Sequence, residues 1–388
     1  MKRILSFFLT LVLTAALLCP AALAVNETAA KDRDWVYITL DPGHGGDGAG
    51  GNDSGAVNEK YGYQEADLVL KIGLYLKEEL ETYRNVHVDM TRSDSYGTRY
   101  TPLREVKQRV DFAAEQCSDL LVSLHLNSAG SNQSVHGGLI LASNGNYDPD
   151  CAKVIDAVGK NILAQLSRLG IDTSRGLVKE GSHDGTTYPN GKLADYYGIV
   201  RYGQLRHIPA MIVEHCFVSS NSDCEQFLSS DAKLRAIAQA DARGIAAYYG
   251  LEKKDPGEVD VEPLFRDCRS HWAKDYVNRA ADAGWVNGVG GGRFEPNRNI
   301  TRQEMAQIMA GYLAWKGVDT HPTADPSAYN IPDRADIAPW ALDSVCFCYE
   351  KGLLSGGDHG FAPLDNATRA QACVVLCGLN DFLRKTEG

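Results

Sequence analysis

The sequence has no excess of basic residues. Its 39 Lys and Arg are outnumbered by 50 Asp and Glu, which gives a formal net charge of −11 at pH 7. Proteins bind nucleic acids largely by neutralising phosphates with basic side chains, so this composition argues against a nucleic-acid partner. Apolar residues make up 44% of the chain and charged residues 23%, as in ordinary globular proteins. The chain is therefore expected to fold and to bind something other than nucleic acid.

Long apolar runs are also missing, except at the start of the chain. Lys2 and Arg3 precede an apolar run over residues 4–18, and small residues follow at Ala22-Leu23-Ala24. This order is typical of a cleavable secretory signal peptide. The run is shorter than the roughly 20 apolar residues that a membrane span needs. We therefore predict a signal peptide over residues 1–24 and an exported mature protein without a transmembrane anchor.

Cysteine is present but lacks the spacing of a metal-binding framework. One of the ten cysteines, Cys19, lies in the predicted signal peptide, and no pair of CxxC motifs is found among the others. The remaining cysteines are odd in number, so they cannot all pair within one chain. We expect most of them to be buried as small apolar side chains, while one or two disulfides stay open as an alternative.

Residues 35–250 alternate between strand patterns and helical patterns, which predicts an α/β domain. We expect a mostly parallel or mixed sheet that is flanked by helices. Residues 171–200 are rich in Gly, Ser, Asp and Tyr, and we interpret them as a loop over a binding face. The expected strands cover residues 35–40, 86–90, 120–124, 138–142 and 210–213, and the expected helices cover residues 64–83, 102–116, 150–169 and 222–249.

The last third of the chain contains an internal repeat. A charged segment with two prolines, residues 251–263, predicts a linker. Two similar segments follow, over residues 264–315 and 330–384. They share a Phe-x-Pro element, at Phe294 and Phe361, and a Thr-Arg element at Arg302 and Arg369. We expect small all-helical repeats that stack on each other to bury a shared apolar face.

Four residues of the first domain have the types and positions of a catalytic metal site. His44 follows the first expected strand, His125 and Glu214 end two others, and Glu65 begins the first helix. Open α/β sheets bind ligands at the carboxyl ends of their strands. Two His and one Glu are a common ligand set for catalytic zinc, and they leave one coordination position open. A further carboxylate then serves as general acid and base, and Glu214 fits that role.

At these residues the chain resembles the N-acetylmuramoyl-L-alanine amidases of the amidase-3 type. The resemblance covers roughly residues 35–249 and keeps the order of the family's motifs. It implies zinc bound by His44, Glu65 and His125, and catalysis assisted by Glu214, on a peptidoglycan substrate. It also implies a structural role for Thr91-Arg92 and Arg109. The matching segments are Asp41-Pro42-Gly43-His44-Gly45-Gly46, Gln64–Leu70, Ser123–Ser128 and Pro209–Glu214 followed by Phe217.

The two repeats resemble S-layer homology modules, of which the family commonly has three copies. The shared elements are His271-Trp272-Ala273, the Phe-x-Pro pair and the Thr-Arg pair. The resemblance implies binding to a secondary wall polysaccharide, with Arg302 and Arg369 as ligand contacts, since an arginine fork suits acidic groups. The alternative is that both arginines only brace helices. Together the two resemblances imply a secreted bacterial protein of the cell wall or cell surface.

Several alternatives stay open from the sequence. Glu59 competes with Glu65 as the acidic ligand, because the segment after His44 is long and rich in glycine. His215 either touches substrate or packs in the core, and His183 is a candidate for substrate contact from the expected loop. Two other functions compete with the amidase: a zinc peptidase that cuts the stem peptide, and an inactive wall-binding module.

Overall fold

The computed structural model describes residues 35–45, 47–48, 51–93, 105–260, 262–354 and 360–387. They belong to two compact units that divide between Glu262 and Pro263, and each unit is described by itself. The predicted signal peptide, residues 1–24, lies outside the described residues.

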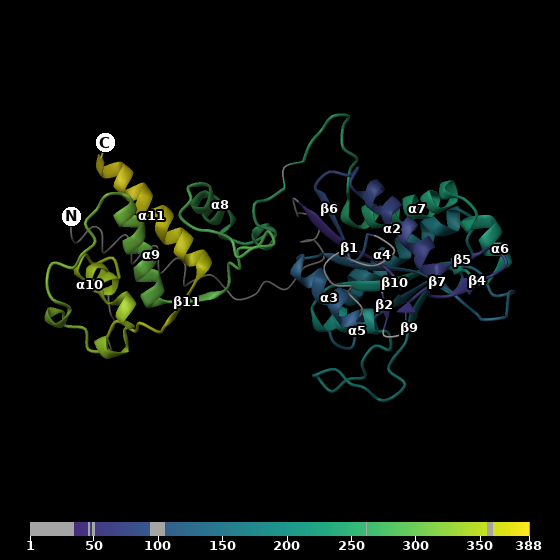
Figure 1. The fold of residues 1–388 in the computed structure, drawn as a ribbon, viewed down its shortest axis with the longest axis horizontal. Helices are drawn as coiled ribbons and strands as arrows, with labels where there is room; N and C mark the ends of the chain where they lie inside the picture. Colours follow the sequence, from purple (N-terminus) through teal and green to yellow (C-terminus); the bar gives the residue numbers. More distant parts are fainter. Residues whose placement is uncertain are drawn as a thin grey trace. The chain divides into compact units, whose positions relative to one another are not determined.

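The first unit is built on a six-stranded mixed sheet (Figure 1). Four neighbouring strands run parallel, and β8 lies antiparallel beside them with β9 parallel to β8. The predicted fold class is therefore confirmed. In sheet order the strands are β6 (Val86–Met90), β1 (Val36–Pro42), β7 (Leu120–Asn127), β10 (Ala210–Phe217), β8 (Leu139–Ala142) and β9 (Leu177–Lys179).

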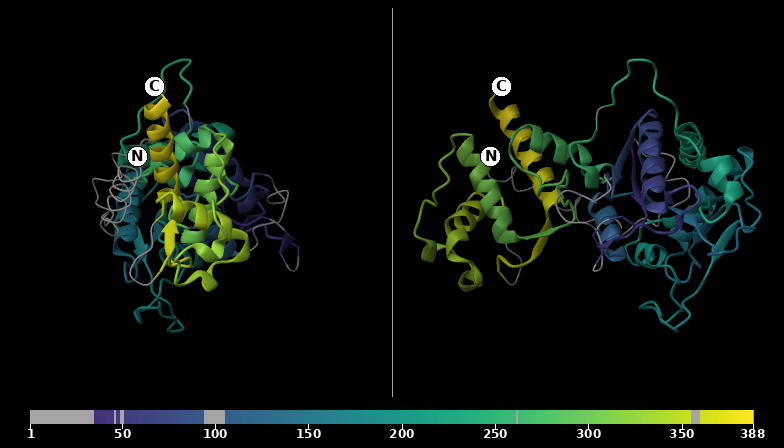
Figure 2. Two further views of the ribbon diagram at one scale, coloured as in Figure 1. Left: turned by 90° about the vertical axis from the view of Figure 1, so that its left-hand side faces the viewer. Right: turned by 45° about the vertical axis from the view of Figure 1, so that its right-hand side comes forward.

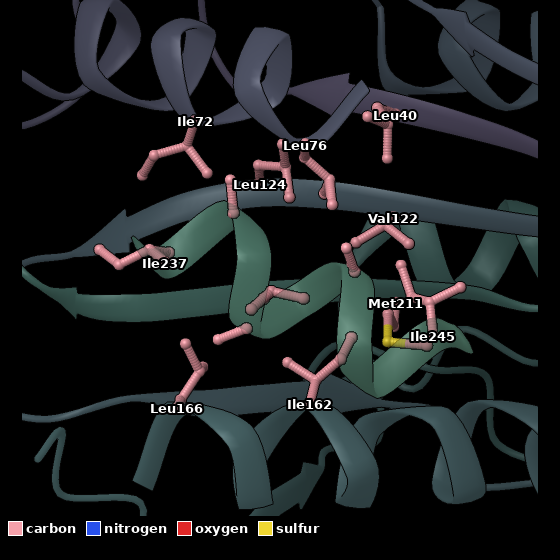
Figure 3. Packing of buried hydrophobic residues seen from close by; sticks show 14 of the residues in the cluster. Leu40, Ile72, Leu76, Val122, Leu124, Ile162, Leu166, Met211, Ile237 and Ile245 are labelled. Carbon is pink, nitrogen blue, oxygen red and sulfur yellow. The ribbon is translucent and has the colours of Figure 1, made fainter. Parts of the chain in front are cut away.

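Helices cover both faces of this sheet. Successive side chains of a strand point to opposite faces, so Val122 and Leu124 of β7 join one apolar cluster and Leu121 joins another. Figure 3 shows the first cluster, where Ile72 and Ile245 approach the same face of the sheet from different helices. That face is covered by α2 (Glu65–Leu80), α4 (Pro149–Arg168) and α7 (Asp231–Tyr249), and the other by α3 (Val106–Glu115) and α5 (Gly198–Leu205).

The helix predicted over residues 222–249 is interrupted in the structure. A three-residue turn, α6 (Asn221–Asp223), leads into a π-helical turn at residues 224–228, and α7 begins only at Asp231. The side chain of Ser230 accepts a hydrogen bond from the backbone N–H of Lys233, so it caps α7 and separates it from the preceding turn. The prediction ran one helix across Ser229-Ser230-Asp231, although polar residues of this kind are typical of a helix start.

The segment expected to be a loop, residues 171–200, contains regular structure at both ends. It includes the edge strand β9 and the first residues of α5. Between His44 and Glu65 the structure has two short hairpins, which the sequence pattern also did not predict. They pair β2 (Asp47–Gly48) with β3 (Gly51–Asn52), and β4 (Val57–Asn58) with β5 (Tyr63–Gln64).

Much of the expected linker lies against the first unit. The guanidinium of Arg84 forms ion pairs with Glu252, Asp255 and Glu258. The carboxylate of Asp260 pairs with Lys254 and accepts a hydrogen bond from the backbone N–H of Asn85. Residues 252–260 therefore continue the first unit.

The second unit contains the two repeats, and each helix of one repeat packs mainly on a helix of the other. The first repeat has α8 (Lys274–Asp282) and α9 (Arg302–Trp315), and the second has α10 (Leu342–Glu350) and α11 (Arg369–Glu387). Helix α8 packs on α11, and α9 packs on α10, so each helix has its main partner in the other repeat. Figure 2 shows the yellow α11 beside the green helices of the first repeat.

The prediction of all-helical repeats needs one correction. The strands β11 (Asn299–Thr301) and β12 (Asn366–Thr368) pair antiparallel. Each strand precedes the second helix of its repeat, so the pairing joins the two repeats at their Thr-Arg elements. The backbone extends there because Thr301 takes the extended conformation of an N-cap residue, and its side chain accepts from the N–H of Glu304.

The cysteines are mostly buried, as predicted. All of those in the described residues except Cys117 are shielded from solvent. Cys216, Cys224, Cys346 and Cys348 are free thiols within the apolar clusters. Burial raises the pKa of the Cys348 thiol to about 12, so it behaves as a small apolar side chain and not as a nucleophile.

Candidate metal centre

Two buried arginines hold the loop that follows β1. Arg92 donates from Nε to the carbonyl of Pro42 and from Nη2 to the carbonyls of Gly43 and Ala66. Arg109 donates to the carbonyls of Pro42 and His44. The carbonyls of this turn thus have donors without water, and the backbone that presents His44 is fixed. This matches the structural role that the sequence resemblance implied for both arginines.

Asp41, near the end of β1, anchors the same loop through its buried carboxylate. Its carboxylate accepts from Arg109 at 2.7 Å, from the Thr91 hydroxyl at 2.6 Å and from the Ser123 hydroxyl at 2.7 Å. Burial alone would raise the pKa of Asp41, but the charge of Arg109 and the hydrogen bonds keep it below its usual value. Asp41 therefore stays ionised in the core and ties β1 to β7 and to the residue after β6.

His44, Glu65 and His125 converge at the carboxyl ends of β1 and β7. The Oε1 atom of Glu65 lies 3.1 Å from Nε2 of His44 and 3.0 Å from Nδ1 of His125. The three candidate ligand atoms lie within 4.8 Å of one another. Burial would raise the pKa of Glu65, but the two histidines lower it well below its usual range. The group is thus an ionised carboxylate between two imidazoles, as a divalent metal requires.

Two glycines make room for this cluster. A Cβ atom on Gly43 would lie 2.3 Å from the ring of His125. A Cβ atom on Gly55 would lie 2.6 Å from the ring of His44 and 2.7 Å from Oε2 of Glu65. Gly55 also has a φ of +62°, a conformation that favours glycine. The glycine-rich character of this segment therefore has a packing cause at the site.

Further contacts fix the orientation of the candidate ligands. Both carboxylate oxygens of Asp53 lie 3.1 Å from Nδ1 of His44, which leaves Nε2 facing Glu65. The backbone N–H groups of Ala56 and Leu126 donate to the carboxylate of Glu65. Sequence reasoning missed Asp53, although an acidic residue close after His44 was the available signal. Glu59 is exposed and outside the cluster, so the structure brings Glu65 into the site instead.

Glu214 lies directly beside this cluster on the neighbouring strand. It is the register partner of His125 in the parallel pairing of β10 with β7. Its Oε2 atom is buried and has no hydrogen-bond partner among the described residues. Burial raises the pKa of Glu214, an effect that the charge of His125 opposes. An unpartnered carboxyl with a raised pKa suits proton transfer near neutral pH.

Comparison with known proteins identifies the families to which the two parts of the chain are similar. The N-acetylmuramoyl-L-alanine amidase family matches residues 38–247. The chain belongs to this family. The S-layer homology domain matches twice, over residues 264–306 and 330–373. Both resemblances that the sequence motifs predicted are thereby confirmed.

Individual relatives of this amidase-family chain are distant. It is 33% identical to an endoglucanase of Bacillus sp. strain KSM-635 over 130 residues, which are 32% of this chain and 14% of that protein. It is 29% identical to the N-acetylmuramoyl-L-alanine amidase AmiC of Escherichia coli over 240 residues, 57% of this chain and 54% of AmiC. The chain thus spans about half the length of AmiC and far less of the endoglucanase.

Among solved structures, the chain is similar to the catalytic domain of CwlV, an N-acetylmuramoyl-L-alanine amidase from Bacillus (Paenibacillus) polymyxa. The sequence identity is 24% and the TM-score is 0.42, and the match covers 56% of this chain and 99% of that one.

Within the described residues, no helix combines the length and the hydrophobicity that crossing a membrane requires.

Two other histidines that the sequence singled out are not members of the cluster. His215 is fully buried and contacts Asp241 and the backbone of His125. His183 is exposed, pairs with Glu180 and lies against the ring of Tyr196. Of the two uses that the sequence left open for His215, the structure favours packing in the core.

In the repeats of this amidase-family chain, Arg302 and Arg369 make matching contacts across the repeat boundary. Arg302 donates from Nε to the carbonyl of Phe361 and lies over its ring. Arg369 donates to the carbonyls of Phe294 and Asn287 and lies over the ring of Phe294. Each arginine therefore braces the Phe-x-Pro element of the other repeat.

Proposed function

We propose that this chain hydrolyses the amide bond between N-acetylmuramic acid and L-alanine in peptidoglycan, with one zinc ion bound by His44, Glu65 and His125. The observation that carries the proposal is the convergence of these three candidate ligand atoms beside Glu214, whose buried Oε2 has no hydrogen-bond partner within the described parts of the chain. Membership of the amidase family supports the choice of bond.

The donor set fits zinc better than a harder cation. Two imidazole nitrogens and one carboxylate oxygen are usual zinc ligands, whereas Mg²⁺ and Ca²⁺ prefer oxygen ligands throughout. The Asp53 carboxylate on Nδ1 of His44 is the kind of outer contact that orients a metal-binding histidine. A zinc ion supplies Lewis acidity, which polarises the carbonyl under attack and acidifies water.

The protein's own contribution to proton transfer is Glu214. Burial raises the pKa of Glu214 above its ordinary value, which favours a carboxyl that can both accept and donate a proton. In the proposed reaction Glu214 takes a proton from the attacking water and gives it to the amine of L-alanine as that group leaves. Because no residue that the structure describes forms a hydrogen bond with Oε2, the carboxyl is available for both steps.

The repeats anchor the proposed enzyme at the cell surface. The S-layer homology match supports binding to cell-wall polymer, and we propose a secondary wall polysaccharide as the ligand. Arg302 and Arg369 remain proposed ligand contacts. Their guanidinium groups also hold the backbone at the junction of the two repeats, so they are placed where the repeats meet. The protein would then act outside the bacterial membrane, in the wall.

Mass spectrometry of purified peptidoglycan after digestion by the chain tests the proposal. We expect free stem peptides that begin at L-alanine, lost with a chelator and restored by zinc. Fragments cut within the stem peptide would replace the amidase with the zinc peptidase. Absence of products together with absence of bound zinc would favour an inactive wall-binding module.

A further inference from the structure

A buried polar pair lies directly behind the proposed catalytic residues. His215 of β10 and Asp241 of α7 are each 0% exposed, and Nε2 of His215 lies 2.8 Å from Oδ2 of Asp241. The other ring nitrogen, Nδ1, lies 3.1 Å from the backbone carbonyl of His125. A carbonyl oxygen only accepts, so Nδ1 carries a hydrogen and donates it to His125.

The pair is an unusual choice for its position. Asp241 lies on α7 among residues of the main apolar cluster, such as Ala238 and Ile245. Its second oxygen, Oδ1, is buried without a partner among the described residues. A buried ionic pair with an unsatisfied oxygen is often no more stable than apolar residues of the same volume. Stability alone therefore gives no reason for this pair.

The pair acts where the sheet is irregular. Glu214 pairs with His125, and the next register pair is Phe217 with Asn127, so β10 has one residue more than β7 in this interval. Such a bulge re-aims side chains and loosens the ladder. His215 lies within the bulge and bonds to the strand opposite it. The side chain of His215 thus contacts the backbone of His125 at the point where the register between Glu214 and Phe217 shifts.

We propose that His215 and Asp241 are positioning residues, which fix the β10 bulge against β7 and so set the placement of His125 and Glu214 relative to each other. The inference rests on the proposed function for the roles of those two residues. It assigns His215 no contact with substrate and no share in proton transfer. In this role the carboxylate of Asp241 orients the ring of His215, and the ring donates a hydrogen bond to the backbone carbonyl of His125.

Paired variants separate this role from a merely structural one. Asp241→Asn keeps both hydrogen bonds, because its amide can donate to Nε2 of a neutral His215 that still donates from Nδ1. The double variant His215→Leu, Asp241→Leu removes both bonds and leaves no buried charge behind. Zinc affinity by chelator competition, kcat, KM and the melting temperature are measured for each full-length variant.

We expect the double variant to bind zinc about 10- to 100-fold more weakly or to lose kcat by the same factor, with little change in KM. Asp241→Asn is expected to stay within about threefold of the native protein in both. The proposal is overturned if the double variant keeps native zinc affinity and kcat, or if Asp241→Asn loses as much. Should the double variant fail to fold, the same comparison is made between Asp241→Ala and Asp241→Asn.

Zinc affinity also separates this proposal from the proposed function. If the native chain binds zinc and does not cleave peptidoglycan, the amidase proposal fails. The zinc affinities then decide the inference by themselves: a weakening in the double variant that is absent from Asp241→Asn supports it, and equal affinities overturn it.

Discussion

Nη1 of Arg109 lies 2.7 Å from Oδ1 of Asp41, and both side chains are buried. Through its other contacts Arg109 also holds the carbonyl of His44. This ion pair thus links the sheet core to the loop that presents a proposed zinc ligand. Removing one charge of a buried pair leaves the other without compensation, which costs about 3–5 kcal/mol.

We predict that Asp41→Asn lowers the free energy of unfolding of the first unit by about 3–5 kcal/mol at pH 7. The pKa of Asp41 is lowered in the folded state, so its stabilising contribution is complete above about pH 4, the unfolded value. It is lost as the pH falls through the lower, folded pKa. Urea unfolding at several pH values should therefore show a difference between native and variant that is constant near neutrality and shrinks below about pH 4.

A difference that stayed constant down to the lowest pH at which the native protein folds would contradict this account. Asp111→Asn is a suitable control, because that carboxylate pairs with Lys107 and Arg206 at the surface. Exposed ion pairs contribute at most about 1 kcal/mol.

Glu214→Gln should retain zinc and lose activity. The amide has nearly the shape of the carboxyl and cannot take a proton from water, so we expect kcat to fall by about 10²- to 10⁴-fold. Metal content by atomic emission and turnover on purified peptidoglycan are the two measurements. Loss of zinc along with activity would assign Glu214 to the metal instead of to proton transfer.

Asp53→Ala should weaken zinc binding, because Nδ1 of His44 then has no acceptor to fix the ring. Loss of such an outer contact usually costs about 10- to 100-fold in metal affinity. Asp53→Asn keeps an acceptor oxygen and should lose less. Chelator competition measures both, and equal affinities for the two variants and the native chain would show that Asp53 does not orient His44.

Deletion of residues 330–388 should unfold the first repeat while the first unit stays folded. The deletion removes α10 and α11, the main packing partners of α9 and α8, and exposes residues such as Met309 and Phe294 that are buried in the intact repeats. Limited proteolysis should then cut within residues 264–329 and spare residues 35–260. A deletion of residues 264–388 is the control. If α8 resists the protease after deletion of residues 330–388, its packing on α11 is not what keeps it folded.

Arg369→Lys should lower the stability of the repeats, because lysine cannot donate to Phe294 and Asn287 in the same fork geometry. Loss of hydrogen bonds from a charged donor suggests about 1–3 kcal/mol. Differential scanning calorimetry measures the loss, and co-sedimentation with purified cell walls measures binding. If wall binding falls by more than the fraction of unfolded protein accounts for, the result supports Arg369 as a contact to the wall polymer. If the variant is as stable as the native protein, Arg369 does not brace the repeats.

The sequence by itself determined the fold class and predicted the four candidate site positions, His44, Glu65, His125 and Glu214. The apolar runs that precede His44, His125 and Glu214 predict buried strands, and parallel strands bring their carboxyl ends to one edge of a sheet. The repeated Thr-Arg and Phe-x-Pro elements likewise determined the division of the last third of the chain. These features are local or periodic, so one sequence is enough to read them.

Only the tertiary structure placed Glu59 outside the cluster and brought Asp53 to His44. The choice of Glu65 over Glu59 depends on where α2 begins beneath the loop after β1, and the part of Asp53 depends on a hairpin that brings it back to His44. The contact of Asp241 with His215 joins helix α7 to strand β10, 26 residues earlier in the chain. The packing of α8 on α11 and of α9 on α10 likewise became known only from the structure. These contacts depend on how the chain folds back on itself, even over the short separation of 9 residues between His44 and Asp53, and no pattern of neighbouring residues determines that geometry.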